Sequence, residues 1–285
     1  MRFELDEKGN PVKTYKKMIQ DSNKLIEEFM LLANKHVAAY VGKAGKVAPR
    51  PLIYRIHDLP DEEKLEQFSV FVSKFGCSFN AGDVRSVAKK MNELFAKLKD
   101  QPELAVVQQM AIKTMAKAVY DTDNIGHYGL GFSHYAHFTS PIRRYADLVV
   151  HRILQHHLNG SPDRYRDLGD TAKHISLTER RAVDAERASN KFFQAKMLEP
   201  ELGKRFHGFI TGLTEWGMYV EMEENGCEGM VSLKSIAYDR FYFDEKSYRI
   251  VGTRSGDLFN LGDKVEVELV AVSVGKRQID LELVY

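Results

Sequence analysis

The spacing of apolar residues changes near residue 203, and this change limits what the chain can fold into. Before it, apolar residues recur at intervals of three and four, which is typical of amphipathic helices. After it, short runs alternate apolar and polar residues, which is typical of half-buried strands. Residues 199–203 (EPELG) separate the two patterns. We therefore predict two domains, residues 1–202 and residues 203–285.

The first domain is expected to be mainly helical. Asp21 caps its first helix, and Pro60 with the acids that follow it opens the next. Pro51–His57 is interpreted as a short extended run and Gly126–Phe138 as a strand or tight loop, because glycine and aromatic residues dominate the latter. Further helices are predicted over residues 80–99, 102–119 and 170–197.

The second domain contains five short strands with turn signals between them. Five strands in roughly 80 residues are typical of a small Greek-key barrel of the OB type. Residues 232–260 are too many for a simple turn and should form a helical turn or lobe of their own. The predicted fold class is α+β, with strands at residues 206–213, 217–222, 228–231, 264–273 and 278–284.

Composition bounds the class of protein. The chain has 285 residues, of which 44% are hydrophobic and 28% charged, and its net charge of +1 does not by itself favour a nucleic-acid partner. Cys77 and Cys227 lie far apart without metal-type spacing, so we expect no disulfide framework. No apolar run approaches the ~20 residues of a membrane span, and the N-terminus lacks a signal-peptide core. We expect a soluble, cytoplasmic protein without a membrane partner.

The segment HYAHFTSPIRRYADLVVHR (134–152) carries the strongest chemical signal. Its hydroxyl residues followed by Pro141 predict a helix start, with Arg143 and Arg144 in the first turn. Cations are unfavourable at a helix N-terminus, whereas phosphate is favoured there, so the arginines indicate a phosphate-docking site. The alternative is that Asp147 pairs with both arginines on a solvated face.

The chain resembles the ribonuclease R and ribonuclease II family. GHYGLGFSHYAHFTSPIRRYADLVVHR (126–152) resembles the closing part of its catalytic RNB domain, and DSNKLIEEFMLLAN (21–34) resembles another helix of that domain. GFITGLTEWGMYVEMEENGCEGMVSL and FNLGDKVEVELVAVSVGKRQIDLEL resemble the S1 domain that follows. The resemblance implies single-stranded RNA degraded from the 3′ end to nucleoside monophosphates, with Mg²⁺ as cofactor.

The resemblance also implies roles for residues of the first domain. Arg143 matches the arginine that stabilises charge on the scissile phosphate, and Glu186 falls near a glutamate that holds the terminal nucleotide. Glu27 or Glu28 matches a position that recognises ribose hydroxyls. Without the family, Glu186 is equally read as a solvated partner of Arg181 or Arg187, and the Glu27–Glu28 pair as a polar helix face. Ser140 and Arg144 complete the expected RNA-contacting motif.

In the second domain, Trp216 and Tyr219 match aromatic positions that stack bases, with Phe209 on the preceding strand. The alternative for such aromatics is barrel core, which we expect for Phe209 and not for Trp216. Lys276 and Arg277 stand at a hairpin tip where phosphates can be contacted. The chain departs from the S1 pattern in having Ser232 and Ser273 where many members have histidine and aspartate, so binding through that face is expected to be weaker or differently arranged.

The family's four-aspartate cluster, which positions two metal ions, has no counterpart in this sequence. We therefore expect no metal site, and a chain that is inactive alone and acts with a separate N-terminal catalytic piece or is a truncated enzyme. The missing half should leave apolar surface exposed. The alternative functions are a non-catalytic RNA-binding protein and a helical scaffold that contacts another protein.

Overall fold

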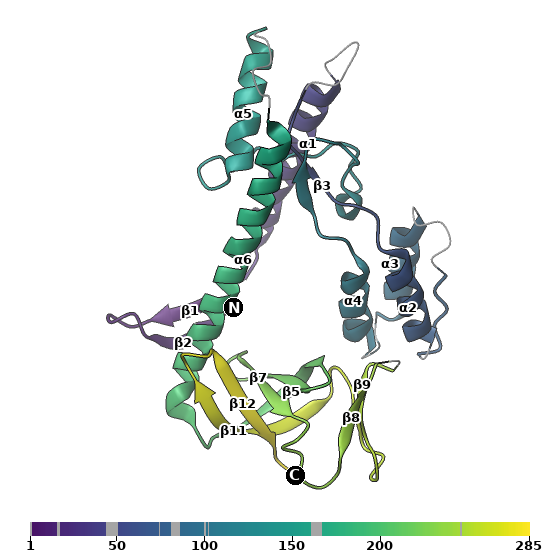
Figure 1. The fold of residues 1–285 in the computed structure, drawn as a ribbon, viewed down its shortest axis with the longest axis vertical. Helices are drawn as coiled ribbons and strands as arrows, with labels where there is room; N and C mark the ends of the chain where they lie inside the picture. Colours follow the sequence, from purple (N-terminus) through teal and green to yellow (C-terminus); the bar gives the residue numbers. More distant parts are fainter. Residues whose placement is uncertain are drawn as a thin grey trace. The chain divides into compact units, whose positions relative to one another are not determined.

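The computed structural model describes most of the chain as two compact units. The barrel unit comprises residues 1–17, 62–113 and 185–285, and the helical unit comprises residues 18–61 and 114–184. One of the divisions between the units falls within a long helix, α6 (Leu168–Leu198) (Figure 1). The described residues are 2–15, 18–43, 51–73, 75–80, 86–99, 101, 103–160, 167–245 and 247–285.

The last hundred residues form the predicted five-stranded OB barrel, which confirms the α+β fold class. The barrel closes in the order β11-β12-β7-β6-β5, with β12 and β7 parallel and the other pairs antiparallel. Its inward residues, among them Ile210, Met218 and Leu269, form one core together with Leu198 at the end of α6. The strands are β5 (Arg205–Leu213), β6 (Gly217–Met222), β7 (Glu228–Ser232), β11 (Lys264–Ser273) and β12 (Gln278–Leu283).

The segment between β7 and β11 forms a lobe that is a sheet, and the predicted helical turn is absent from its described residues. Asp239 anchors it, since this buried carboxylate accepts hydrogen bonds from the backbone N–H groups of Arg254 and Ser255. These hydrogen bonds hold the pKa of Asp239 well below its usual value. The three strands pair antiparallel in the order β10-β9-β8, with bounds β8 (Phe241–Asp244), β9 (Arg249–Gly252) and β10 (Leu258–Phe259).

Three further helices and a hairpin belong to the barrel unit. The side chain of Gln109 donates to the carbonyl of Thr211 on β5 at 3.0 Å, and the ring of Phe71 contacts that of Tyr248 in the lobe. The elements are β1 (Arg2–Leu5), β2 (Pro11–Tyr15), α2 (Glu62–Ser73), α3 (Val87–Lys97) and α4 (Glu103–Thr114).

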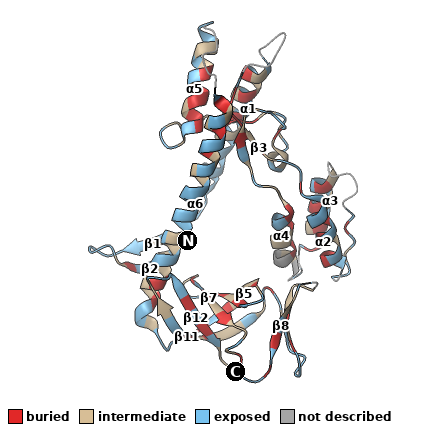
Figure 2. Cartoon of the chain, in the orientation of Figure 1, coloured by how far each residue is buried: buried red, intermediate tan, exposed pale blue. Residues whose placement is uncertain are grey.

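The helical unit packs its helices around a two-stranded sheet. Its core joins Ala38 and Val41 of α1, Tyr54 of β3, Ile153 of α5 and Ile175 of α6. Figure 2 shows buried residues in red on these elements, while residues 180–187 of α6 are all exposed. The elements are α1 (Asp21–Lys43), β3 (Tyr54–Ile56), β4 (Val119–Asp121), a 3₁₀ turn (Tyr128–Leu130), α5 (Tyr145–Leu158) and the first part of α6.

Several local expectations were wrong. The helix expected to continue to Val119 ends at Thr114, because Val119 pairs with Ile56 in the β3–β4 sheet. The helix expected from Asn80 is first seen at Val87, with residues 81–85 outside the described part. The N-terminal β1–β2 hairpin was not anticipated, because its strands are largely exposed and show little apolar alternation.

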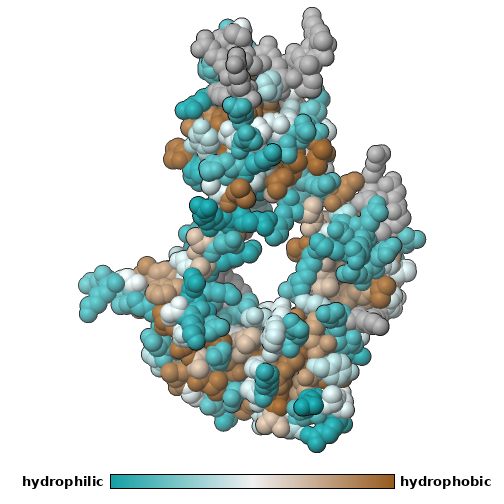
Figure 3. All heavy atoms as spheres, viewed as in Figure 1, coloured by the Kyte–Doolittle hydropathy of each residue, from teal (hydrophilic) through white to brown (hydrophobic). Residues whose placement is uncertain are grey.

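Helix α1 exposes much of the apolar stripe from which it was predicted. Leu25, Ile26, Phe29 and Leu32 are each half or more exposed, and Phe29 reaches 61%. Figure 3 shows hydrophobic surface, in brown, on both units. This helix therefore carries a group of exposed apolar side chains.

Among the described residues, no helix combines the length and the apolar character that crossing a membrane requires.

Candidate functional site

The segment before α5, which carries the HYAHFTSPIRR motif, is held by a buried amide from α1. Asn34 is 3% exposed; its Oδ1 accepts from the backbone N–H of Phe138 at 2.9 Å and its Nδ2 donates to the hydroxyl of Tyr135 at 3.1 Å. A buried amide that satisfies both ends of its side chain fixes its partners, since breaking either bond leaves a buried polar group unpaired. Asn34 thereby positions the backbone that leads to the arginines.

Helix α5 holds the same segment through Asp147, whose side chain is fully buried. Its Oδ1 accepts from the backbone N–H of Ser140 at 2.7 Å, and its Oδ2 lies 3.0 Å from Nε of Arg144. His151, one turn further on, contacts the carbonyl of Phe138 at 2.8 Å and stacks on its ring. A fully buried carboxylate is tolerated because it is both hydrogen-bonded and paired.

The predicted start of α5 was wrong. Residues 141–143 form a turn and Arg144 is the extended N-cap, so the helix begins at Tyr145 and both arginines precede it. The carboxylate of Asp147, and not the expected hydroxyl cap, accepts the backbone hydrogen bond that fixes this turn. The alternative, in which Asp147 pairs with both arginines on a solvated face, does not hold, because the buried Asp147 pairs with Arg144 alone.

Arg143 is the cation that this arrangement leaves available. Its guanidinium donates to the hydroxyl of Ser140 at 3.3 Å and forms no ion pair within the described part of the chain. It lies on the turn that leads into the N-terminus of α5, where the helix dipole is positive. An exposed guanidinium beside a positive helix end suits an anionic ligand.

A pocket of 210 Å³ brings several predicted residues together. Glu27 of α1 lines it together with Arg143 and Arg144, whereas Glu28 does not line it. The buried hydroxyl oxygen of Thr139, also in the lining, has no hydrogen-bond partner among the described residues. The pocket is completed by Asn23, Ile26, Met30, Leu31, Asn34 and Tyr135.

Two histidines of the helical unit, one of them within this segment, are held neutral. Burial, together with the positive charge of Arg144, lowers the pKa of His137 to about 3, and burial together with His57 lowers that of His127 to about 4. His137 Nδ1 lies 2.8 Å from the hydroxyl of Tyr120, whose pKa burial raises to about 12. These neutral rings add no positive charge, whereas the pocket lining itself contains the cations Arg143 and Arg144.

Glu186, the other residue predicted to take part in catalysis, is on α6. It lies in the exposed stretch of α6 that belongs to the barrel unit, and neither Arg181 nor Arg187 forms an ion pair with it. Its predicted role near the terminal nucleotide stays a prediction.

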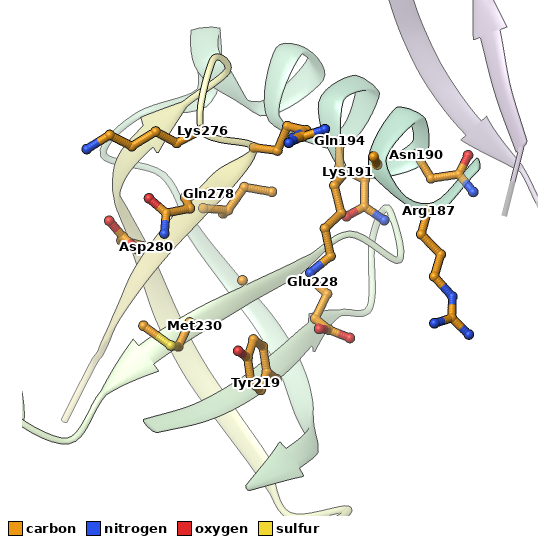
Figure 4. Close-up of a pocket in the computed structure, with 14 residues that line it drawn as sticks. Arg187, Asn190, Lys191, Gln194, Tyr219, Glu228, Met230, Lys276, Gln278 and Asp280 are labelled. Atoms are coloured by element: carbon orange, nitrogen blue, oxygen red, sulfur yellow. The ribbon is translucent and has the colours of Figure 1, made fainter. Parts of the chain in front are cut away.

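The predicted residues of the barrel fall into two groups. Tyr219, Lys276 and Arg277 line a groove of 680 Å³ together with residues of α6 (Figure 4). Trp216 is 66% exposed on the turn before β6 and is not part of that lining. Phe209 is partly buried on the outer side of β5, between the inward-facing Gly208 and Ile210, so the barrel-core interpretation of Phe209 was wrong.

The residues that the structure describes do not fit a bound metal ion. No group of three histidine, cysteine or acidic side chains in them is placed to hold one. The carboxylate of Asp121, two residues before that of Asp123, is engaged in a backbone turn, with its Oδ1 accepting from the N–H groups of Thr122 and Asp123. We therefore assign no catalytic step through a metal to these residues.

Sequence reasoning missed the residues that position the site. Asn34 was overlooked because it lies among the apolar residues of α1. A single amide side chain on the apolar face of a helix is the sequence feature that could have identified it. Asp147 was considered only as an ion-pair partner, and its hydrogen bond to the Ser140 backbone depends on the loop geometry.

Comparisons with known proteins cover nearly all of the chain. The RNB domain model matches residues 1–160 and the S1 RNA binding domain model matches residues 199–283. Ribonuclease R of Aquifex aeolicus is 36% identical over 284 residues, which is 98% of this chain and 40% of the relative. The apo form of Mycoplasma genitalium RNase R superposes with a TM-score of 0.87 at 28% identity, over 99% of this chain and 45% of that one.

A second Mycoplasma genitalium RNase R structure, in complex with ribose-methylated single-stranded RNA, superposes with a TM-score of 0.86 at 29% identity. The chain thus spans less than half the length of these relatives. It belongs to the RNB family of ribonuclease R-type proteins, and it corresponds to the C-terminal part of the RNB domain followed by an S1 domain.

Proposed function

We propose that this chain is the RNA-binding C-terminal portion of a 3′-to-5′ exoribonuclease that degrades single-stranded RNA to nucleoside monophosphates. The observation that carries the proposal is Arg143, an exposed guanidinium without an ion-pair partner among described residues, which precedes a helix N-terminus and lines one pocket together with Glu27. The family to which the chain belongs, and the RNA bound to its Mycoplasma relative, support RNA as the ligand.

The pocket suits the sugar–phosphate of a ribonucleotide. Arg143 contacts a phosphate oxygen through a charge-assisted hydrogen bond, and Arg144 adds positive charge while remaining tied to Asp147. Glu27 accepts a hydrogen bond from a ribose hydroxyl, which distinguishes RNA from DNA. Glu28 lies outside the lining, so we assign the ribose role to Glu27.

Hydrolysis by this chain alone is not part of the proposal. The family enzymes use Mg²⁺, and a site for it does not emerge from the described residues. The metal ligands then come from polypeptide that corresponds to the part of the relatives beyond this chain's span, whether covalently joined or separate. We propose that this polypeptide packs on the apolar face of α1 formed by Leu25, Ile26, Phe29 and Leu32.

The test uses the purified chain, 5′-labelled single-stranded RNA and Mg²⁺, resolved at single-nucleotide steps beside an EDTA control. We expect intact RNA together with a salt-sensitive binding shift, and about tenfold weaker binding for Arg143→Ala. Arg152→Ala, which removes an exposed arginine of the following helix α5, is the matched control and should bind as wild type. An EDTA-sensitive ladder would overturn the predicted inactivity, and the absence of binding would overturn the RNA-binding role.

A second arm adds a polypeptide that carries the N-terminal part of the Aquifex aeolicus relative. We expect EDTA-sensitive shortening of the RNA to appear with wild type and to be lost with Phe29→Asp, which places a charge in the apolar face. Equal shortening with both would show that α1 is not the contact surface.

The alternative of an RNA-binding protein without any hydrolytic partner is not favoured, because the chain matches ribonuclease R relatives along nearly its full length. The helical-scaffold alternative predicts that neither Arg143→Ala nor Trp216→Ala changes RNA affinity, and the same assay tests it.

A further inference from the structure

The first part of α6 contacts the β3–β4 sheet of the helical unit through polar side chains. Glu179 of α6 forms an ion pair with Arg55 of β3, with 2.6 Å between Oε2 and Nη1, and the Arg55 side chain is only 15% exposed. Ser176, also on α6, accepts a hydrogen bond from the backbone N–H of Tyr120 on β4 at 3.0 Å. Because a buried strand N–H needs a partner, these contacts hold the sheet in place against the helix.

Arg55 and Tyr120 are directly opposite each other in this sheet. The guanidinium carbon of Arg55 lies 4.6 Å from the centroid of the Tyr120 ring, an arrangement that a cation and an aromatic face favour. Tyr120 is 4% exposed, so its ring cannot move without displacing close-packed neighbours. The backbone N–H of Arg55 donates to the carbonyl of Tyr135 at 2.9 Å, which joins the sheet to the segment before α5.

The hydroxyl of Tyr120 continues these contacts to His137, whose Nδ1 lies 2.8 Å away. Burial raises the pKa of the Tyr120 hydroxyl to about 12 and is the main cause of the lowered pKa of His137, about 3, so both groups are neutral near pH 7. The positive charges of Arg144 and Arg143 also lower the pKa of His137. The ring of His137 therefore lies within electrostatic range of both cations of the pocket.

We infer that Tyr120 is a positioning residue for Arg143: its hydrogen bond to His137 holds the segment that leads to the arginine, and the Arg55–Glu179 ion pair holds Tyr120 in place. Tyr120 is not part of the pocket lining and contacts no ligand there. It acts through geometry, because a small displacement of a charged group weakens its contact with a bound phosphate. The inference rests on the proposed RNA-binding function and extends it to residues outside the pocket.

The test measures the affinity of the full chain for a 5′-labelled single-stranded RNA by fluorescence anisotropy, in a double-mutant cycle. Tyr120→Phe removes one hydroxyl, keeps the ring, and should bind RNA about fourfold more weakly, as the loss of one hydrogen bond allows. In the Arg143→Ala background the same change should have no effect, because a residue that acts through Arg143 cannot weaken a contact that is already absent.

Tyr54→Phe is the matched control. Tyr54 is also buried in the β3–β4 sheet, but its hydroxyl forms no hydrogen bond with another described residue, so this variant should bind RNA as wild type does. Tyr120→Phe is expected to lower the stability of the helical unit as well. Urea unfolding of each variant therefore accompanies the binding curves, which are compared under conditions where every variant is folded.

His137 provides a second pair of variants. His137→Asn keeps an acceptor at the place of Nδ1 and should bind RNA within about twofold of wild type. His137→Ala removes the acceptor and should weaken binding at least as much as Tyr120→Phe. Equal binding by the two His137 variants would show that the hydrogen bond does not position the segment.

Glu179→Gln separates position from charge. Removing one negative charge makes the chain more positive and should by itself strengthen RNA binding. We expect weaker binding instead, because the variant breaks the ion pair that holds Arg55 over Tyr120. Asp170→Asn removes the same charge from an exposed position on α6 and should bind as wild type or slightly more tightly.

An equal loss from Tyr120→Phe in both Arg143 backgrounds would show that Tyr120 supports the fold in general, and would overturn the inference. Unchanged affinity in Tyr120→Phe, or tighter binding by Glu179→Gln, would also overturn it, while weaker binding by Arg143→Ala would leave the proposed function standing. If wild type binds no RNA, the proposed function and this inference fail together.

Discussion

The Arg143 pocket of the helical unit and the α6 groove of the barrel unit are both cationic, but they are built differently. In the pocket, buried polar side chains hold the loop: Asn34 is hydrogen-bonded at both ends and Asp147 is fully buried. In the groove, the lining side chains come from α6 and from barrel strands. The apolar core that stabilises those strands lies inside the barrel. A buried polar network fixes the geometry of its side chains, but losing one partner lowers the stability of the fold. Side chains on an open surface can bind a ligand without this cost, because water solvates them when a partner is absent.

This difference assigns different roles to the two sites. A guanidinium whose supporting turn is fixed by internal hydrogen bonds suits the positioning of one phosphate for chemistry. A basic and aromatic surface suits binding of many sequences with additive contacts. Substitutions beneath the pocket should therefore unfold the helical unit, and substitutions in the groove should change affinity alone.

The largest expected effect is on Asp147. Asp147→Leu leaves Arg144 and the Ser140 N–H without their buried partner and should destabilise the helical unit by about 3 kcal/mol. Urea unfolding followed by helical circular dichroism should show this loss, while the fluorescence of Trp216, the single tryptophan, reports the barrel and should keep its midpoint. The surface variant Asp170→Asn should cost less than about 1 kcal/mol. A loss at Asp147 no larger than this would show that the pocket is not held by burial.

The second effect is a dependence of the helical unit on pH. His137 and His127 stay neutral in the folded state down to their lowered pKa values of about 3 and about 4, whereas in the unfolded chain they protonate near 6.5. The unfolded state therefore binds more protons as pH falls, and stability present at pH 7 is lost progressively between pH 6.5 and pH 4, by roughly 2–4 kcal/mol after allowance for solvent screening.

Urea unfolding at pH 7 and pH 4.5 measures this loss. His137→Asn keeps an acceptor for the Tyr120 hydroxyl but removes one titrating ring, so it should flatten the pH dependence. The same slope in the variant and in wild type would exclude His137 as its source.

The smallest effect concerns an acid in the groove. Partial desolvation of Glu228 raises its pKa, with the nearby Lys191 acting in the opposite direction, and at neutral pH its charge opposes phosphate binding. Glu228→Gln should strengthen RNA binding about twofold, since a pair of exposed charges contributes about 0.5 kcal/mol. Weaker binding in the variant would mean that the carboxylate accepts a hydrogen bond from RNA. Glu224→Gln, an exposed acid outside the lining, is the control.

The regular elements of the barrel could be predicted because their signals are local. The alternation in residues 264–273 and 278–284 and the glycine between them define a hairpin without reference to the rest of the chain. The end of α4 and the pairing of Val119 could not be predicted in this way, because β4 forms only by contact with β3, more than 60 residues earlier. The start of α5 was displaced for a related reason: the buried carboxylate of Asp147 holds Ser140 in a turn that local propensity assigns to helix.

The sequence by itself determined the chemical identity of the candidate site, because Arg143 and its motif lie in one continuous segment. It also determined the order of the RNB and S1 parts. Only the tertiary structure decided that Arg144 is neutralised by Asp147 while Arg143 is not, that Glu27 lines the pocket and Glu28 does not, and that α6 forms a wall of the barrel groove. Each of these depends on which side of a helix faces a segment distant in sequence. Burial and hydrogen bonding across such distances arise only when the chain is folded.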